Sequence, residues 1–313
     1  MQHITDEMVD RHVSAEDAQR VMLDAFRSFG SGRAAMQERI RTEAGGVKLS
    51  TLAAVIPEQQ VAGAKVYTTI NGQFSFVILI FSTVDGRPLA SLDAGAITRL
   101  RTAACTVMAA RHLARSDSGT LALFGAGTQG FAHARQLGRA LPLRRILVCD
   151  PYAPEGLAAR LGAECNVDVQ MVEPSAANEA VGQADIVVTA SRSTTPLFQG
   201  SALRPGAFVA AIGSSLPHTR ELDDTALARA ATVVVEWRPQ SMREAGDIVL
   251  AAEGVLPDTK IVELADVVLE RVQPRRQPED IVIYKSVGVG LEDVALAGFA
   301  WSRISQSAHS PAT

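Results

Sequence analysis

The sequence predicts an α/β protein that combines a doubly wound parallel sheet with an α+β domain of antiparallel strands. Between residues 120 and 236, near-continuous apolar strands alternate with helical segments, which is typical of a parallel sheet covered on both faces. Before residue 93, β-rich runs are separated by Asn-Gly and Asp-Gly pairs, which indicate antiparallel hairpins. The length of 313 residues suits two domains of roughly 150 residues each.

Charge, hydropathy and cysteine content exclude several classes of protein. Thirty Lys and Arg against 34 Asp and Glu give a net charge of −4, so we expect no nucleic-acid partner. The longest apolar run, residues 76–81, is far shorter than the ~20 residues of a membrane helix, and no secretion signal opens the chain. Three cysteines without a CxxC spacing argue against a disulfide framework and a zinc site. We therefore expect a cytoplasmic protein with reduced thiols, no membrane contact and no metal.

The first half of the chain opens with an amphipathic helix, expected over residues 15–29. Ser14 is its predicted N-cap, and Asp17 stands at the capping-box position. An Ala-rich helix follows the strands and is expected from residue 97 to about 115. The small polar residues 116–119 then indicate a linker and a domain boundary. The expected strands of this half span residues 47–56, 65–70, 74–82 and 87–92.

In the second half, expected strands and helices alternate, as in a doubly wound sheet. Helices are expected from residue 129 and over about 155–161, and residues 305–313 read as a frayed tail. The expected strands span residues 120–124, 145–149, 185–189, 207–212 and 232–236.

A glycine-rich turn follows the first of these strands and opens a helix. In such a GxGxxG turn the first glycine makes the bend, the second lets a diphosphate approach the backbone, and the third permits close helix packing. The helix N-terminus supplies amides and a positive dipole to the phosphates. We therefore predict a Rossmann dinucleotide site. Its glycine turn consists of Gly125, Ala126, Gly127, Thr128, Gln129 and Gly130.

An acidic residue at the end of the next strand bears on the choice of cofactor. Asp150 lies twenty residues after Gly130, where a carboxylate accepts hydrogen bonds from ribose hydroxyls and repels a 2′-phosphate. NAD is therefore favoured over NADP. Two alternatives stay open: Asp150 could only cap the following turn, and Arg160 could hold a 2′-phosphate.

Four segments together resemble the ornithine cyclodeaminase and mu-crystallin family. They are DAGAITRLRTAA at 93–104, GAGTQG at 125–130, IGSSLPHTRELDD at 212–224 and KSVGVGLEDVALA at 285–297. The resemblance implies a substrate-binding and dimerisation domain of residues 1–115 and 291–313, with a Rossmann domain over 116–290. It also implies a homodimer in which the antiparallel strands of two subunits join.

The same resemblance implies a site for small α-imino or α-amino carboxylates. The matching basic positions are Arg39, Lys65 and Arg101, and Arg41 is a close rival of Arg39. An arginine can bind a carboxylate through two parallel hydrogen bonds, whereas a desolvated lysine can act as an acid or a base. Each of the three cations could also be an ordinary solvated surface residue.

The chain departs from the cyclodeaminases at Ser215, where they carry a catalytic Asp. A serine hydroxyl alone cannot replace a carboxylate base, and mu-crystallin-like ketimine reductases resemble this chain in having Ser there. The hypothesis is an NAD(P)H-dependent reductase of cyclic ketimines or of imines of 2-oxo acids, with Lys65 and Ser215 as catalytic residues. His218 is an alternative proton donor. The alternatives are a cyclodeaminase-type lyase with bound NAD, an alanine-dehydrogenase-like enzyme and a non-enzymatic binding protein.

Further residues at strand ends are expected beside the nicotinamide half of the cofactor, because ligands bind at the carboxyl edge of a parallel sheet. Gly288 and Gly290 could equally be turn formers. Glu221, Asp223 and Asp224 are interpreted as helix-start residues, and capping of the last helix is the interpretation for at least one of Glu292 and Asp293. The residues expected to contact the nicotinamide half are Ser191, Gly213, Ser286, Val287 and Gly288.

Overall fold

The computed structural model describes residues 1–309, and the chain forms two compact units. Unit 1 consists of Met1–Cys105 and the chain from Val289 onward, and unit 2 is Thr106–Gly288. Helix α3 (Gly95–Leu113) contributes residues to both units. The predicted fold class is confirmed, since one sheet is entirely parallel and the other largely antiparallel. The domain boundaries at residues 115/116 and 290/291 stay predictions.

Unit 1 contains a seven-stranded sheet of order β1-β7-β6-β5-β4-β2, and β3 also pairs with β4. β1 and β7 pair in parallel, and the remaining neighbours are antiparallel. The Asn-Gly turn between β5 and β6 has φ of 48° at Asn71 and 74° at Gly72, which confirms the predicted tight hairpin. The strands are β1 (Gln2–Ile4), β2 (Ala35–Met36), β3 (Ile40–Ala44), β4 (Val47–Ile56), β5 (Val61–Ile70), β6 (Gln73–Ser82) and β7 (Pro88–Asp93).

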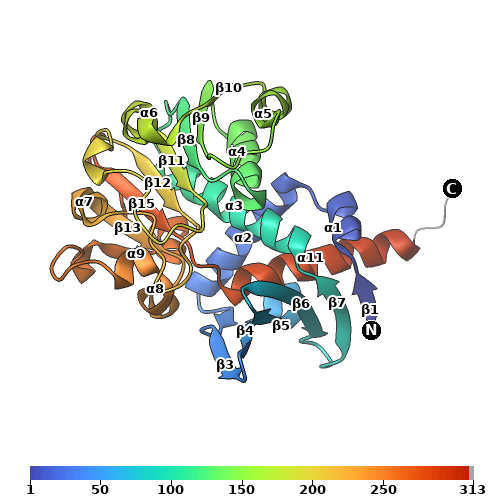
Figure 1. The fold of residues 1–313 in the computed structure, drawn as a ribbon. Helices are drawn as coiled ribbons and strands as arrows, with labels where there is room; N and C mark the ends of the chain where they lie inside the picture. Colours follow the sequence, from blue (N-terminus) through green and yellow to red (C-terminus); the bar gives the residue numbers. More distant parts are fainter. Residues whose placement is uncertain (310–313) are drawn as a thin grey trace. The chain divides into compact units, whose positions relative to one another are not determined.

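Three helices belong to unit 1 alone: α1 (Asp6–His12), α2 (Ala15–Gly30) and α11 (Gly290–His309). The predicted capping box of Ser14 and Asp17 opens α2. α11 packs against β4, β5 and α2 (Figure 1). At Gly290 a Cβ would lie 2.7 Å from the carbonyl oxygen of Ala53, so only glycine allows this approach. Because α11 runs to His309, the frayed tail predicted from residue 305 is wrong over 305–309, and its last residues lie outside the described ones.

Unit 2 contains an eight-stranded, all-parallel sheet of order β10-β9-β8-β11-β12-β15-β13-β14. The five predicted strands are found within two residues of their expected ends. β10, β14 and β15 were not predicted; β10 is short and largely exposed, so its sequence lacks an apolar run. The strands are β8 (Thr120–Phe124), β9 (Arg145–Cys149), β10 (Asp168–Met171), β11 (Ile186–Thr189), β12 (Phe208–Ala211), β13 (Ala230–Val235), β14 (Ile261–Glu263) and β15 (Ile281–Lys285).

The order of this sheet locates its ligand-binding edge. β8 is flanked by β9 on one side and by β11 on the other (Figure 1). The chain therefore changes direction across the sheet at β8, and the carboxyl ends of β8 and its neighbours form the edge where such folds bind ligands. The helices of this unit are α4 (Thr128–Ala140), α5 (Leu157–Cys165), α6 (Ala177–Gln183), α7 (Asp224–Arg229), α8 (Arg238–Glu244), α9 (Gly246–Val249) and α10 (Leu264–Val268).

All three cysteines are free thiols. Cys105 and Cys149 are buried free thiols, and Cys165 is a partly exposed free thiol. Burial raises the pKa of the Cys149 thiol and that of the Cys165 thiol. Within residues 1–309, every helix is too short or too polar to cross a membrane.

Candidate active site

The glycine-rich turn joins β8 to α4, and each glycine meets a different surrounding. Gly125 has a φ of 86°, and a Cβ there would lie 2.7 Å from the carbonyl oxygen of Ala190. A Cβ on Gly130 would lie 1.8 Å from the carbonyl oxygen of Gly125. Gly127 is exposed, and a Cβ there would have no neighbouring atom within 4 Å. The first and third glycines are thus required by the fold, whereas the second faces open space.

The N-terminus of α4 has the features of an anion site. Its N-cap is Gly127, and no side chain caps the helix. The amides of the first turn and the positive end of the helix dipole can therefore be used by a ligand. Thr128 beside it is exposed. These features, together with the open space at Gly127, fit the diphosphate of a dinucleotide.

Asp150 lies at the end of β9 and is tied to the glycine turn. Its Oδ2 accepts a 2.6 Å hydrogen bond from the N–H of Ala126, and its Oδ1 accepts a 2.8 Å bond from the N–H of Tyr152. The second bond shows that Asp150 does cap the following turn. Each carboxylate oxygen keeps a further lone pair for a ribose hydroxyl. Arg160 stacks on Phe131, with its Cζ 4.1 Å from the ring centroid.

Glu221 holds the loops that follow β11 and β12. Its Oε1 accepts bonds of 2.7 Å from both the N–H and the hydroxyl of Ser191. Its Oε2 accepts bonds from the N–H of Gly213 at 2.8 Å and from that of Ser214 at 3.1 Å. The side chain is fully buried. The interpretation of Glu221 as a helix-start residue is therefore wrong, whereas Asp223 does cap α7 through the N–H of Ala226.

A buried lysine lies beside the end of β12. Lys285, the last residue of β15, lies 2.8 Å from Asp247 and donates to the carbonyl oxygen of Ala211 at 3.2 Å. Burial raises the pKa of Glu221, and the positive charge of Lys285 opposes that rise. Neither Lys285 nor Asp247 was predicted as a site residue. The sequence feature that could have indicated Lys285 is a charged residue at the end of an otherwise apolar segment.

Glu236 holds the loop that follows β15, as Glu221 holds the loops that follow β11 and β12. It accepts hydrogen bonds from the hydroxyl of Ser286 at 2.5 Å and from the N–H groups of Val287 at 2.9 Å and Gly288 at 2.8 Å. These amides serve the loop itself, so the predicted contacts of Ser286, Val287 and Gly288 with the cofactor stay predictions. Ser215 is half-buried and His218 is exposed, and neither side chain has a hydrogen-bond partner among residues 1–309.

In unit 1, two of the predicted cations meet two carboxylates. Lys65 of β5 donates to Asp293 Oδ1 at 3.2 Å and to Thr98 Oγ1 at 2.9 Å. Arg101 of α3 donates through Nε to the same Asp293 oxygen at 3.1 Å and through Nη1 to Glu292. The interpretation of at least one of Glu292 and Asp293 as a helix cap is therefore incomplete, because both carboxylates bind cations.

Burial and neighbouring charges set the protonation of this cluster. Burial lowers the pKa of Lys65 to about 8, although the charge of Asp293 raises it; Arg101 and Arg39 lower it further. Burial raises the pKa of Asp293, but Arg101 and Lys65 outweigh burial, so that pKa lies below its usual value. Arg39 is thus close to both groups, whereas Arg41 sits within β3 opposite Ser50. A lysine with a pKa near 8 can give up a proton at physiological pH.

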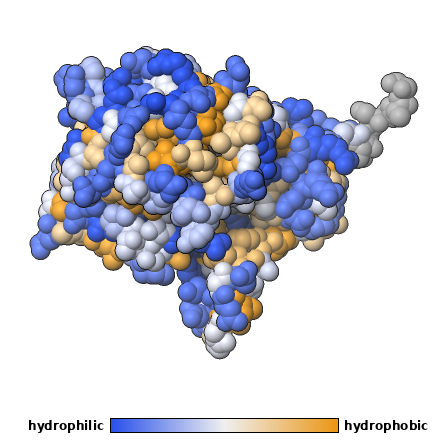
Figure 2. Space-filling view, turned by 45° about the horizontal axis from the view of Figure 1, so that its top comes forward, coloured by the Kyte–Doolittle hydropathy of each residue, from blue (hydrophilic) through white to orange (hydrophobic). Residues whose placement is uncertain are grey.

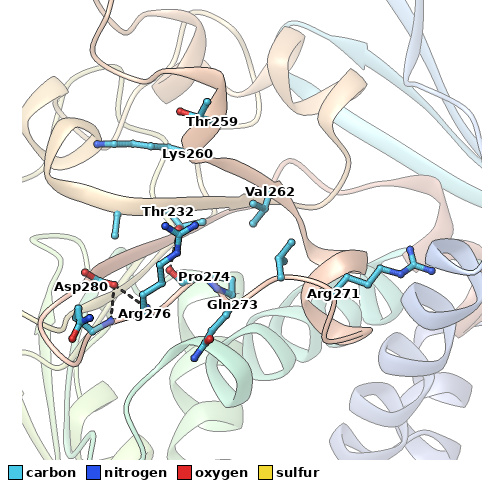
Figure 3. A pocket seen from close by; sticks show the side chains of 12 residues that line it. Thr232, Thr259, Lys260, Val262, Arg271, Gln273, Pro274, Arg276 and Asp280 are labelled. Carbon is cyan, nitrogen blue, oxygen red and sulfur yellow. Dashed lines mark hydrogen bonds between the residues drawn. The ribbon is translucent and has the colours of Figure 1, made fainter.

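A separate cavity of about 850 Å³ lies in unit 2 at the amino ends of β13, β14 and β15 (Figure 3). Lys260, Arg271 and Arg276 line it, and Asp280 accepts hydrogen bonds from the backbone of Arg276 and Gln277. This is the edge of the sheet opposite the glycine turn, and none of the predicted site residues lines the cavity.

The fold and the glycine turn define a Rossmann-type α/β protein with a second unit that carries a buried cation cluster. The chain matches the ornithine cyclodeaminase/mu-crystallin family over residues 2–308 and belongs to it, which confirms the resemblance.

The chain is similar to proteins with different described activities. A Delta(1)-pyrroline-2-carboxylate reductase of Bacillus cereus is 30% identical over 263 residues, which are 83% of this chain and 78% of the relative. The structure of a probable ornithine cyclodeaminase from Bordetella pertussis is 63% identical, covers 100% of both chains and has a TM-score of 0.95. An archaeal alanine dehydrogenase dimer with bound NAD is 25% identical, covers 98% and 97% of the chains and has a TM-score of 0.89.

Proposed function

We propose that the protein is an NADH-dependent reductase of small α-imino carboxylates, such as pyrroline-2-carboxylate or piperideine-2-carboxylate. The observation that supports this most is Lys65, a buried lysine with a pKa of about 8 that shares a carboxylate with Arg101 and lies near Arg39. A site of this kind offers cations for a carboxylate and a proton for a nitrogen. The Bacillus cereus relative, a Delta(1)-pyrroline-2-carboxylate reductase, agrees with that chemistry.

In the proposed reaction, the C=N bond gains a hydride at carbon and a proton at nitrogen, and an α-amino acid forms. Arg101 and Arg39 bind the carboxylate of the substrate and fix its plane. Lys65 donates the proton or keeps the imine protonated, which makes its carbon a better hydride acceptor. Ser215 orients the substrate or a water molecule.

The residues of the glycine turn and Asp150 would hold the dinucleotide. NADH, when bound, supplies the hydride. Glu221 keeps Ser191 and Gly213 in place after β11 and β12. NAD is proposed over NADP because the Asp150 carboxylate repels a 2′-phosphate and because the Arg160 side chain stacks on Phe131.

The similarity to the probable ornithine cyclodeaminase of Bordetella pertussis favours a second candidate function, that of an ornithine cyclodeaminase-type lyase with bound NAD. Cyclodeamination needs a carboxylate to activate the amine or water. At the position that resembles the cyclodeaminase Asp, this chain has Ser215, a neutral side chain. The reductase is therefore preferred, and an alanine-dehydrogenase-like reaction is the same chemistry with an open-chain imine.

A homodimer is proposed from the surface of unit 1. Figure 2 shows a small apolar patch among hydrophilic residues on the lower projection, and exposed apolar side chains stand on several strands of unit 1. Water-exposed apolar side chains on neighbouring strands are a typical contact surface. Those on β3–β6 are Ile40, Val47, Leu49, Val55, Ile70, Phe74, Phe76 and Phe81.

Oxidation of NADH, followed by absorbance, tests the proposal directly. Pyrroline-2-carboxylate, piperideine-2-carboxylate and pyruvate with and without ammonia or methylamine are the substrates, and ammonia release from L-ornithine is measured in parallel. The proposal expects NADH consumption with a cyclic imine and formation of the matching amino acid. Ammonia release from ornithine without net NADH consumption would instead establish the lyase.

A further inference from the structure

One oxygen of Asp293 joins the two cations of the cluster. Asp293 Oδ1 lies 3.2 Å from Lys65 Nζ and 3.1 Å from Arg101 Nε. Asp293 of α11 and its two partners, Lys65 of β5 and Arg101 of α3, thus come from three elements that are far apart in the sequence. A shared carboxylate oxygen therefore fixes the separation of the lysine and the arginine.

Burial decides how Asp293 can act. The side chains of Asp293 and Glu292 are 0% exposed, whereas those of Lys65 and Arg101 are 5% and 7% exposed. A ligand can therefore touch the cations but not the carboxylates beneath them. Any influence of Asp293 on the chemistry must pass through Lys65 or Arg101.

We propose that Asp293 is a positioning residue that holds Lys65 beside Arg101 and keeps Lys65 charged for proton transfer to the substrate nitrogen. The part of this inference that concerns the substrate rests on the proposed function. The part that concerns the charge of Lys65 does not.

The groups that face Lys65 come from four other parts of unit 1. Thr98 and Arg101 belong to α3 and Asp293 to α11, and the ring of Phe76 on β6 lies 5.1 Å from Lys65 Nζ. Arg39, which precedes β3, also lowers the pKa of Lys65. Among these groups Asp293 supplies the negative charge, so neutralising it leaves Lys65 with burial and two cations, all of which favour the uncharged amine.

The small number of lysines makes a direct measurement practical. The chain has four: Lys48, Lys65, Lys260 and Lys285. Lysine labelled with carbon-13 at Cε gives one titrating signal per residue in the full-length protein, and Lys65→Met assigns the signal of Lys65. We expect the wild-type Lys65 pKa near 8 and, in Asp293→Asn, a pKa about one to three units lower.

Two further variants separate charge from shape. Asp293→Glu keeps the carboxylate and should restore most of the wild-type value. Glu292→Gln is the matched control, because Glu292 is the adjacent residue and binds Arg101 rather than Lys65; its Lys65 signal should titrate within about half a unit of wild type. Should Asp293→Asn not fold, Arg101→Gln gives the opposite test, because removing that cation should raise the pKa of Lys65.

The dependence of kcat/KM on pH then connects the charge to the reaction. In wild type, imine reduction should decline above pH 8 or so, and in Asp293→Asn the decline should begin at a lower pH by the same shift that the labelled signal shows. An unchanged Lys65 pKa in Asp293→Asn, or an unchanged one in Arg101→Gln, would overturn the inference. If the signals shift as expected but no imine is reduced, the proposed function fails and the role of Asp293 toward Lys65 stands.

Discussion

Replacing Lys65 by Met should make the protein more stable while removing its activity. Methionine has a similar length and no charge. The folded environment lowers the pKa of Lys65 from 10.5 to about 8, which means that the charged form is disfavoured by about 3 kcal/mol at neutral pH. Loss of the hydrogen bond to Thr98 takes away about 1 kcal/mol of stability. The expected gain in the free energy of unfolding is therefore about 2 kcal/mol.

The free energy of unfolding of wild type and that of Lys65→Met should also depend differently on pH. Between pH 8 and pH 10.5 the unfolded wild type binds a proton that the folded form does not, so wild-type stability rises with pH across this window. Urea unfolding should therefore show a smaller difference in the free energy of unfolding between Lys65→Met and wild type at about pH 10 than at about pH 7.

Steady-state kinetics of Lys65→Met test the catalytic role of this lysine. Lys65→Met should reduce kcat for pyrroline-2-carboxylate by about 10²- to 10⁴-fold, and the dissociation constant of NADH should stay unchanged. Nearly normal turnover would remove Lys65 from the chemistry. A variant that is clearly less stable than wild type near neutral pH would show that the charge of Lys65 supports the fold, contrary to the reasoning.

Other residues of the site give separate predictions. Gly127→Ala should unfold like wild type, because its Cβ meets no atom within 4 Å, but bind NADH less tightly; Gly130→Ala should lose stability, because its Cβ would lie 1.8 Å from a carbonyl oxygen. If Gly127→Ala and Gly130→Ala changed the free energy of unfolding equally and the NADH affinity equally, this contrast would be wrong. Asp150→Ala should raise kcat/KM with NADPH relative to NADH; a preference for NADPH already present in wild type and kept in the variant would exclude the ribose contact. Glu221→Ala should lower the free energy of unfolding by several kcal/mol, at about 1 to 3 kcal/mol for each buried N–H left unpaired, and a change below about 1 kcal/mol would refute that role.

The sequence could predict those parts of the fold that depend on local patterns. Apolar strands such as 120–124 and 145–149 are found at the expected residues, and the capping box at Ser14 opens α2. β14 has three residues and β10 has mostly exposed ones, so their pairing depends on the neighbouring strands rather than on their own composition.

Unlike Asp150, the carboxylates Asp293, Glu221 and Glu236 could not be assigned their roles from the sequence, because those roles depend on residues distant in the chain. Asp293 meets Lys65 across 228 positions and Arg101 across 192. Glu221 and Glu236 resembled ordinary polar residues near strand or helix ends, and only the folded sheet brings Ser191, Gly213 and Val287 to them. The cations were identified by resemblance, and the structure adds the acids that pair with Lys65 and Arg101.

A crystal structure with NADH and L-proline tests most directly the proposal that Lys65, Arg101 and Arg39 bind a small imino acid beside the nicotinamide. We expect the proline carboxylate on Arg101 and Arg39, its nitrogen at Lys65 Nζ and its α-carbon facing the nicotinamide ring. Proline bound elsewhere, with Lys65 and Arg101 still enclosed by Asp293 and Glu292 and without contact to the ligand, would contradict it.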